Sequence, residues 1–482
     1  MKKSLLILGI AAAGLFSSCD ENLADLNTDP KNPIEVKPEV LFTNGQYNLV
    51  KQMVNIDYNQ NLDRLWANYL TQTTYIQESA YDAANRDVGG SLWDNIYTET
   101  LFELKQAKEL LLSEEVADPN LVPVRNNQLA MVRVLEVYAY QYLVDNFGSI
   151  PFTEALDIDN VTPVYDEGDF IYGAIIDSLD VAINDFDASA NGFSRSSDIL
   201  YGGDVAAWEK FANSIKLKIG LRLADAQPSV ASNLISEAVA AGVFESNDDN
   251  AVYNFSSSQP YTNPIYDYFE VDSRASDFVV TQFFIDMLEE VNDPRMEAYF
   301  DDNIEDGYVG GEYGASGNAY ASLTHVNPAL VETTFPGTIL DYSFVEFSLA
   351  EAVERGIISG SAAEHYNNGI QASFEAWGLS EAAATLYIAQ PSVNYLTAAG
   401  DYKEKIGKQK YIALFNQGHE AWTEARRLDA PQLLTAVSNG VENPKRLIFP
   451  TNEPLINTTN YNAASDVLGG DDTTSPIFWD MN

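Results

Sequence analysis

The stretch that decides the fold is LAMVRVLEVYAYQYLVDNFG, residues 129–148. Its apolar side chains recur every three or four residues, which is the spacing of one broad face of an α-helix. Gly148 follows the last apolar residue, and glycine commonly ends a helix. We therefore predict a long helix over residues 126–147. The predicted apolar face consists of Leu129, Val132, Leu135, Tyr138, Ala139, Tyr142 and Leu143.

The same helical spacing continues on both sides of this stretch. It predicts one helix or a kinked pair over residues 38–75, and a further helix over residues 92–115. The remaining predicted helices cover residues 168–187, 205–225, 229–241, 278–291, 344–355, 361–377, 380–389 and 403–426. Successive helices joined by short turns favour stacked helical hairpins. No strict 34-residue consensus recurs, so the pattern alone predicts a mainly α chain and leaves a repeat architecture open.

Two long regions, residues 245–277 and 300–343, interrupt the helical pattern. Both are rich in glycine, asparagine, serine and aromatic residues, and loops of this length usually carry function. The aromatic residues singled out here are Tyr253, Phe255, Tyr261, Tyr266, Tyr268, Phe269, Tyr308, Tyr313 and Tyr320. Rings with a polar tip suit sugars or peptides, because they offer an apolar face and a hydrogen bond together. The alternative is that these rings pack the loops onto the helices.

The N-terminus predicts a lipoprotein signal peptide over residues 1–18. Lys2 and Lys3 form a positive region, and the apolar run that follows is about twelve residues, too short for the roughly twenty that span a bilayer. Ser17 and Ser18 precede Cys19, the only cysteine in the chain, as in a lipobox. We expect Cys19 to carry lipid. The alternative, a retained free thiol, is disfavoured because the exported compartment is oxidising.

Residues 19–37 are predicted to form a flexible tether, and residues 38–482 a single helical domain with loop insertions. The tether is polar and contains the turn-forming run NTDPKNP, which cannot build a core. No Pro/Ser-rich linker or charge block divides residues 40–460. The chain is 46% hydrophobic, which allows a sizeable core.

The charge balance excludes nucleic acid as a partner. The chain has 71 Asp and Glu residues against 27 Lys and Arg, a formal net charge of -44. Binding to a phosphate backbone requires Lys and Arg to neutralise it, whereas this surface repels it. The acidic surface is explained by solubility at a crowded cell surface.

Catalytic motifs are missing from the sequence. The three histidines, His325, His365 and His419, lie far apart, and Thr423 stands where a zinc-binding HExxH motif needs its second histidine. No GxSxG or GxxxxGK[ST] motif is present. Pairs of carboxylates carry no information among so many acids, although glycoside hydrolysis needs such a pair. We predict that the protein is not an enzyme, with no catalytic residues and no cofactor.

One acidic loop bears a weak likeness to a calcium-binding loop. Asp301, Asn303 and Glu305 stand at positions 1, 3 and 5, and Glu312 at position 12. The glycine falls at position 7 in place of position 6. A solvated acidic loop is the alternative, so no metal site is predicted beyond this candidate.

Several segments, taken in order, resemble the SusD/RagB family of nutrient-binding outer-membrane lipoproteins, in its SusD-like branch. They are NTDPKNP (27–33), LWDNIYTETL (92–101), VRVLEVYAYQYLVDNFGSIPFTEAL (132–156), WEKFANSIKLKIGLRLAD (208–225), VNDPRMEAYF (291–300), FSLAEAVERG (347–356), HYNNGIQASFEAWG (365–378), IGKQKYIALFNQGHEAWTEARRLDAP (406–431) and PKRLIFPTNEPLINTTNYNAA (444–464). Each is weak alone. Together they are spread across nearly the whole mature chain.

The resemblance implies a fold of about four tetratricopeptide-like helix pairs, with loop elaborations forming the ligand face. It implies a lipid-anchored position on the outside of the outer membrane in Bacteroidetes, where the acidic pair Asp20 and Glu21 resembles a surface-export signal. The implied partner is a SusC-like TonB-dependent transporter, which receives a captured oligosaccharide or peptide. A surface-anchored glycan hydrolase and a helical-repeat scaffold without a small ligand are the alternatives.

The resemblance also divides the residues into two roles. Arg426, Arg427 and Asp429 are expected to tie helix ends together, and Glu351 with Arg355 to form an i, i+4 pair on a helix surface. Ligand contacts are expected from the loop after the first long helix and from the central insertion. The candidate ligand-binding residues are Tyr75, Tyr81, Arg86, Trp93, Tyr261, Tyr308, Tyr313 and Tyr320. The sequence does not identify the ligand.

Overall fold

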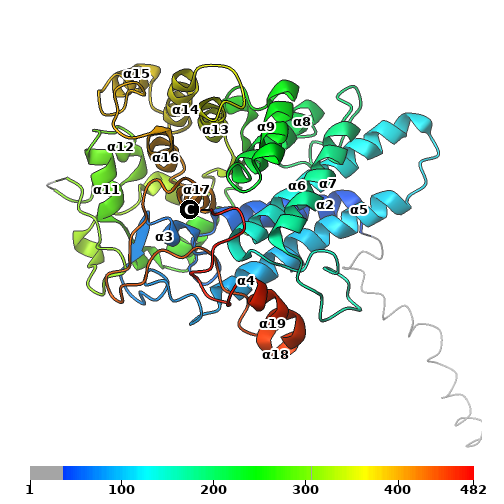
Figure 1. The fold of residues 1–482 in the computed structure, drawn as a ribbon, viewed down its shortest axis with the longest axis horizontal. Coiled ribbons are helices and arrows are strands. Elements are labelled where there is room, and N and C mark those ends of the chain that lie inside the picture. Colours follow the sequence, from blue (N-terminus) through cyan, green and yellow to red (C-terminus); the bar gives the residue numbers. More distant parts are fainter. Residues whose placement is uncertain (1–35, 306, 482) are drawn as a thin grey trace, which may run out of the picture.

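The computed structural model describes residues 36–305 and 307–481, so the signal peptide, Cys19 and nearly all of the tether lie outside the described residues. The described chain is mainly α-helical, as predicted (Figure 1). Its α-helices are α2 (Pro38–Val54), α3 (Asp63–Trp66), α4 (Val88–Asp94), α5 (Phe102–Ser113), α6 (Val122–Phe147), α7 (Gly168–Asp185), α8 (Val205–Arg222), α9 (Pro228–Ala241), α10 (Pro264–Tyr266), α11 (Gln282–Glu289), α12 (Met296–Tyr299), α13 (Tyr342–Glu354), α14 (Ala362–Ala376), α15 (Glu381–Ile388), α16 (Tyr402–Ala413), α17 (Gly418–Leu428), α18 (Glu453–Ile456) and α19 (Thr458–Val467).

Consecutive helices pack as hairpins. The pairs are α6 with α7, α8 with α9, α13 with α14 and α16 with α17. Neighbouring pairs contact one another, because α7 packs on α8, α8 on α13, and α13 on α16. Figure 1 shows the resulting row of helices, with α2 and α5 beside α6 at one end. The predicted stacked hairpins are confirmed.

The long helix predicted at residues 126–147 is α6, which begins four residues earlier at Val122. Gly148 ends it with a positive φ of 82°, a conformation that favours glycine. The helix is buried on every side over its second half, including Gln141, Asp145 and Asn146. It is therefore a central helix of the core, and its polar residues need partners inside the protein.

Two predicted helices turn out to be divided. The helix or pair predicted at 38–75 ends at Val54, because Asn55 Oδ1 accepts a hydrogen bond from the backbone of Asp57 at 3.0 Å and starts a turn. The helix predicted at 403–426 is broken between α16 and α17. Gly418 lies so close to another segment that an added Cβ would sit 2.7 Å from the backbone nitrogen of Arg64.

Within the described residues, four short strands form two antiparallel pairs, and the strand signal was missed in the sequence. Residues 278–280, predicted as the start of a helix, are β3 (Phe278–Val280), which pairs with β1 (Leu70–Gln72). Adjacent valines, which favour strands, explain the difference. The second pair is β2 (Ala251–Tyr253) with β4 (Gly337–Leu340).

In the described residues of 245–277 and 300–343, the regular structure before α13 begins at Tyr342 consists of β2, β4 and short helical turns. These two insertions fold back on the helices, and the main hydrophobic core runs from Phe42 through Phe278 and Tyr313 to Trp479. Among the described residues, no helix combines the length and apolar character required to cross a membrane.

Candidate ligand-binding face

The β1–β3 pair brings the loop after α3 next to the central insertion. Gln72 lies opposite Phe278 in the register. The backbone of Gly311 extends this pair, since its N–H donates to Val280 O at 2.8 Å and Gln282 N–H donates to its carbonyl at 2.9 Å. Segments separated by about 200 residues in the sequence thereby share one surface.

Tyr75 is the most exposed aromatic ring at this surface, with an exposed fraction of 62%. Its backbone has a positive φ of 54°, and Asn68, Tyr81 and Asp87 in the same segment are also in this left-handed region. Such residues are uncommon outside glycine and cluster at functional sites. The backbone strain is held in place by the surrounding hydrogen bonds.

Arg86 lies beside Tyr75 and is itself fixed. Its guanidinium carbon is 5.7 Å from the centre of the Tyr75 ring and 4.9 Å from that of Tyr58. Its Nη1 contacts Glu78 Oε1 at 2.5 Å, and that carboxylate is fully buried. The arginine therefore presents a flat, electrically balanced surface next to an exposed ring.

Arg274 also contacts Tyr58, with its guanidinium carbon 5.8 Å from the ring centre. Its Nη2 donates to Tyr58 Oη at 2.5 Å and pairs with Asp277 Oδ2 at 2.5 Å. Burial raises the pKa of Tyr58, with a further contribution from Asp277. The sequence analysis missed both Tyr58 and Arg274. They are separated by 216 residues and carry no local motif, although Arg274 does fall in the aromatic-rich insertion.

A hollow of about 150 Å³ adjoins this group and contains the Tyr320 ring. Tyr320 stacks on His325, with ring centres 3.7 Å apart and planes 10° apart. Phe278 connects the hollow to the previous group, because it lines the hollow and its ring lies 6.0 Å from Tyr58. We call the surface formed by Tyr75, Arg86, Arg274, Tyr320 and His325 the aromatic face; Tyr58, which is 5% exposed, supports it from below.

Three of the candidate residues lie inside the protein. Tyr81 donates its hydroxyl to Leu434 O at 2.7 Å, and Tyr313 donates to Leu65 O at 2.9 Å. Trp93 packs against Tyr97 and Phe147. These rings are at most 8% exposed. They support the loops from below and are not part of the aromatic face.

The remaining two candidates lie elsewhere. Tyr261 is 53% exposed and packs edge-on against Tyr47, beside the β2–β4 pair. Burial, which is the main cause, raises the pKa of Tyr47 to about 12. Tyr308 is half-buried against Phe300, with ring centres 5.7 Å apart. The structure does not bring either ring into contact with Tyr75 or Tyr320.

In the loop compared with a calcium site, the Asn303 side chain forms hydrogen bonds with backbone groups of the protein. Asn303 Oδ1 accepts from the backbone of His325 at 3.2 Å, and Asn303 Nδ2 donates to Leu323 O at 2.9 Å. Within residues 36–305 and 307–481, no three His, Cys, Asp or Glu side chains lie close enough to hold a metal ion. The carboxylates of Asp301, Glu305 and Glu312 therefore do not converge in the described structure.

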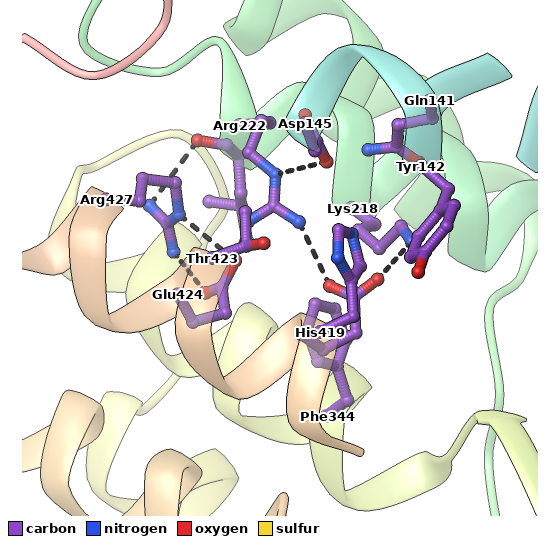
Figure 2. Close-up of polar contacts among 12 residues, drawn as sticks. Gln141, Tyr142, Asp145, Lys218, Arg222, Phe344, His419, Thr423, Glu424 and Arg427 are labelled. Atoms are coloured by element: carbon purple, nitrogen blue, oxygen red, sulfur yellow. Dashed lines mark hydrogen bonds and ion pairs between the residues drawn. The ribbon is translucent and has the colours of Figure 1, made fainter. Parts of the chain in front are cut away.

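The strongest electrostatic cluster is buried between α6, α8, α13 and α17 (Figure 2). Arg222 is fully buried and contacts Asp145 Oδ2 at 3.3 Å and Glu420 Oε2 at 3.0 Å; it also pairs with Glu424. Lys218 binds Glu420 Oε1 at 2.6 Å. Burial alone would raise the pKa of Glu420, but Lys218 and Arg222 hold it at about 2.

The same cluster contains residues predicted to tie helices together. Arg427 binds both carboxylate oxygens of Glu351, at 2.7 and 2.6 Å, and Arg426 donates to Asp145 O at 3.0 Å. Arg355 pairs with Glu351 at 2.8 Å as predicted, but placing this pair on a helix surface was wrong, because Glu351 is fully buried. The cluster is enclosed, so its role is to hold the helices together.

The isolated histidines do not form a catalytic arrangement. His365 Nδ1 lies 2.7 Å from Glu346 Oε2, and His325 is stacked under Tyr320. His419 is buried against Tyr142, and burial lowers its pKa well below the ordinary value. These three side chains lie in separate environments, in contact with different residues.

Comparison with known proteins identifies relatives over most of the chain. Residues 30–450 match the model of the SusD-like family described as starch-binding and associating with the outer membrane. A solved chitin-binding protein is 27% identical, with a TM-score of 0.79, covering 92% of this chain and 100% of its own. No protein among the curated sequences matches.

Two further solved structures share the fold. A chitin-binding SusD homologue from Flavobacterium johnsoniae is 24% identical, with a TM-score of 0.79, and the match covers 92% of this chain and 99% of that one. A SusD homologue from Bacteroides uniformis is also 24% identical, with a TM-score of 0.77 and the same coverage. At this identity the likeness establishes the architecture alone.

Proposed function

Because the chain belongs to the SusD-like family of starch-binding proteins that associate with the outer membrane, we propose that it is a nutrient-binding lipoprotein of the cell surface. It captures an oligosaccharide on the aromatic face and delivers it to a SusC-like TonB-dependent transporter, over which it acts as a lid. The observation that carries the ligand assignment is the exposed Tyr75 ring beside Arg86 and the Tyr320 hollow.

The chemistry of the aromatic face favours a neutral ligand. Each arginine is already paired with a carboxylate, Arg86 with Glu78 and Arg274 with Asp277. The flat faces of Tyr75 and Tyr320 can pack against the apolar C–H face of a sugar ring, while hydroxyl groups bond to the polar tips. The chitin-binding description of a relative that is 27% identical supports a glycan. A peptide is the alternative ligand.

The lipid anchor is inferred from the sequence alone, because Cys19 lies outside the described residues. Helix α2 begins at Pro38, so residues 19–37 connect the lipid to this helix. A chain of this length reaches at most roughly 65 Å when fully extended. This reach lets the helical body move over the mouth of a transporter while remaining attached. Residues 38–482 then act as one ligand-carrying domain.

The proposed role is binding without chemistry. The carboxylates with the most strongly lowered pKa values, Glu420 and Glu424, are enclosed between helices and paired with cations. A glycan hydrolase would need a carboxylate pair open to its substrate. Turnover of a polysaccharide that is lost on replacing a carboxylate near the Tyr320 hollow, such as Asp301, would support the hydrolase instead.

Purification of the native complex tests the transporter partnership. The lipidated protein, carrying an affinity tag after Asn482, is extracted from outer membranes in mild detergent. We expect a TonB-dependent barrel to copurify with the tagged protein in a constant ratio. When a tagged Cys19→Ser chain is instead added to membranes that hold no tagged protein, we expect it to recover less of the barrel. Recovery of the lipoprotein without any barrel would contradict the partnership. It would not bear on the proposed ligand binding, which is tested separately.

A further inference from the structure

A second hollow, of about 360 Å³, shares a wall with the Tyr320 hollow. The shared wall is the segment 325–331, which ends in the 3₁₀ turn η8 (Pro328–Val331). His325 and Val326 line the Tyr320 hollow, whereas Asn327 and Ala329 line the second one. We call this second cavity the Trp377 hollow. Its volume lies within the range typical of small-ligand pockets.

Trp377 gives this hollow a fixed aromatic surface. The residue directly follows α14 and is partly exposed. Its ring meets Tyr299 edge-on at 4.5 Å between centres and lies 6.2 Å from Phe335, which also lines the hollow. The indole N–H of Trp377 has no hydrogen-bond partner within the described part of the chain. Trp377 therefore lines the cavity with an aromatic ring that its neighbours hold in place.

Gln417 supplies a buried acceptor in the same lining. Its Nε2 donates to Asp341 Oδ2 at 2.6 Å, which fixes the orientation of the amide. Its Oε1 is buried and has no hydrogen-bond partner among residues 36–305 and 307–481. A buried acceptor left unpaired costs about 1–3 kcal/mol, so a donor supplied by a ligand would be favourable here.

The charged groups that line the hollow disfavour an ionic ligand. Its lining contains no lysine, arginine or histidine, and Asp341 is its one ionisable residue. Both Asp341 oxygens are occupied, because Oδ1 caps α13 by accepting from Phe344 N at 2.7 Å and Oδ2 accepts from Gln417. An anionic ligand finds no cation. The remaining chemistry, an aromatic ring with amide groups, matches a neutral ring that carries hydroxyl groups.

We propose that the Trp377 hollow is a second saccharide position, in which a neutral pyranose ring stacks on Trp377 and one of its hydroxyls donates to Gln417 Oε1. The ligand class rests on the proposed function, but the position is separate from the aromatic face. The two positions share the 325–331 segment, so an oligosaccharide held at one keeps its far end at high local concentration near the other.

Indole resonances test this position directly, with chitotriose as the probe. The non-lipidated mature chain (residues 19–482, Cys19→Ser) is ¹⁵N-labelled, and the Trp377 indole signal is assigned by its loss in Trp377→Phe. We expect that signal to shift saturably with chitotriose, and to do so in Tyr320→Ala as well. Ala329→Arg, which fills the hollow, should weaken this response at least about tenfold, a change of about 1.4 kcal/mol.

A matched control and the contrary results complete the test. Ala399 is exposed and lines neither hollow, so Ala399→Arg should leave the Trp377 response unchanged. One contrary result is a Trp377 signal that does not shift even though calorimetry shows chitotriose binding that depends on Tyr320. That result would overturn the second position and leave the proposed function intact. A shift caused by trialanine and not by sugar would overturn the saccharide assignment. Absence of binding to chitotriose and maltotriose at either site would overturn both proposals.

Discussion

Single residues in this protein show how an acidic chain stabilises buried charge. Glu420 is 2% exposed and accepts from Lys218 and Arg222, which keep its pKa at about 2 although burial alone would raise it. Removing one partner of such a buried ion pair leaves the charges of the remaining partners uncompensated, whereas an exposed ion pair contributes little to stability. The buried cluster therefore makes the fold sensitive to acid.

The first prediction concerns Glu420→Gln. The folded pKa of about 2 lies below the ordinary value of 4.5, so the unfolded chain binds this proton first as the pH falls. The stabilisation is complete above pH 4.5 and is lost between pH 4.5 and 2. We expect the variant to lose about 3 kcal/mol of unfolding free energy at pH 7 and to show a flatter decline below pH 4.5.

Urea unfolding at a series of pH values measures this effect. His419 acts in the same direction, because its depressed pKa makes the unfolded chain take up a proton first below pH 6.5; that part of the decline remains in the variant. Glu289→Gln, at an exposed position on α11, serves as the control and should match the wild type. A variant curve parallel to the wild type below pH 4.5 would show that Glu420 is not held ionised.

At the scale of elements, the aromatic face depends on how the segment that contains Gly310 and Gly311 is held. Gly310 and Gly311 run beside β3, and a Cβ added to Gly310 would lie 2.2 Å from the backbone nitrogen of Gln282. Backbone atoms cannot move aside as a flexible side chain can. This contact fixes the segment that carries Tyr320 and His325.

Gly310→Ala should therefore weaken oligosaccharide binding without touching a binding residue. We expect the affinity for chitohexaose to fall at least about tenfold, equivalent to about 1.4 kcal/mol, with a lower melting temperature. Gly317→Ala in the same loop is the matched control, since its added Cβ meets no atom within 4 Å. Calorimetry with both variants decides the matter: equal affinities would mean that the loop position does not control the face.

The success of sequence-based prediction also differs between elements. The central helix α6 was predicted because its apolar spacing is continuous, and similar spacing elsewhere favoured stacked hairpins. The number of about four pairs came from the family resemblance. The break before Gly418 could not be predicted, since it depends on contact with Arg64, 352 residues away from Asn416. For the face, Tyr75 and Arg86 were proposed from the family resemblance, and Tyr320 from that resemblance together with the composition of its loop. Tyr58 and Arg274 are far apart in the sequence, and only the fold brings them together.

At the scale of the whole molecule, the chain is a negatively charged, mainly helical protein for which we propose a lipid tether at Cys19. The net charge of -44 keeps such a body soluble and repels other acidic surfaces. We expect Cys19→Ser to move the protein from the outer-membrane fraction to the soluble fraction while its thermal unfolding stays unchanged. Immunoblotting of separated fractions checks this; a variant that remains in the membrane fraction would contradict the lipid anchor.

The central claim is that the aromatic face binds an oligosaccharide. Isothermal titration of the non-lipidated mature chain with chitohexaose and maltohexaose tests it most directly, comparing wild type with Tyr75→Ala, Tyr320→Ala and Tyr261→Ala, the last being an exposed ring outside the face. We predict saturable binding of at least one of these glycans, weakened at least about tenfold by Tyr75→Ala or Tyr320→Ala and unchanged by Tyr261→Ala. Binding that is equally strong in all four proteins, or absent from the wild type, would contradict the account.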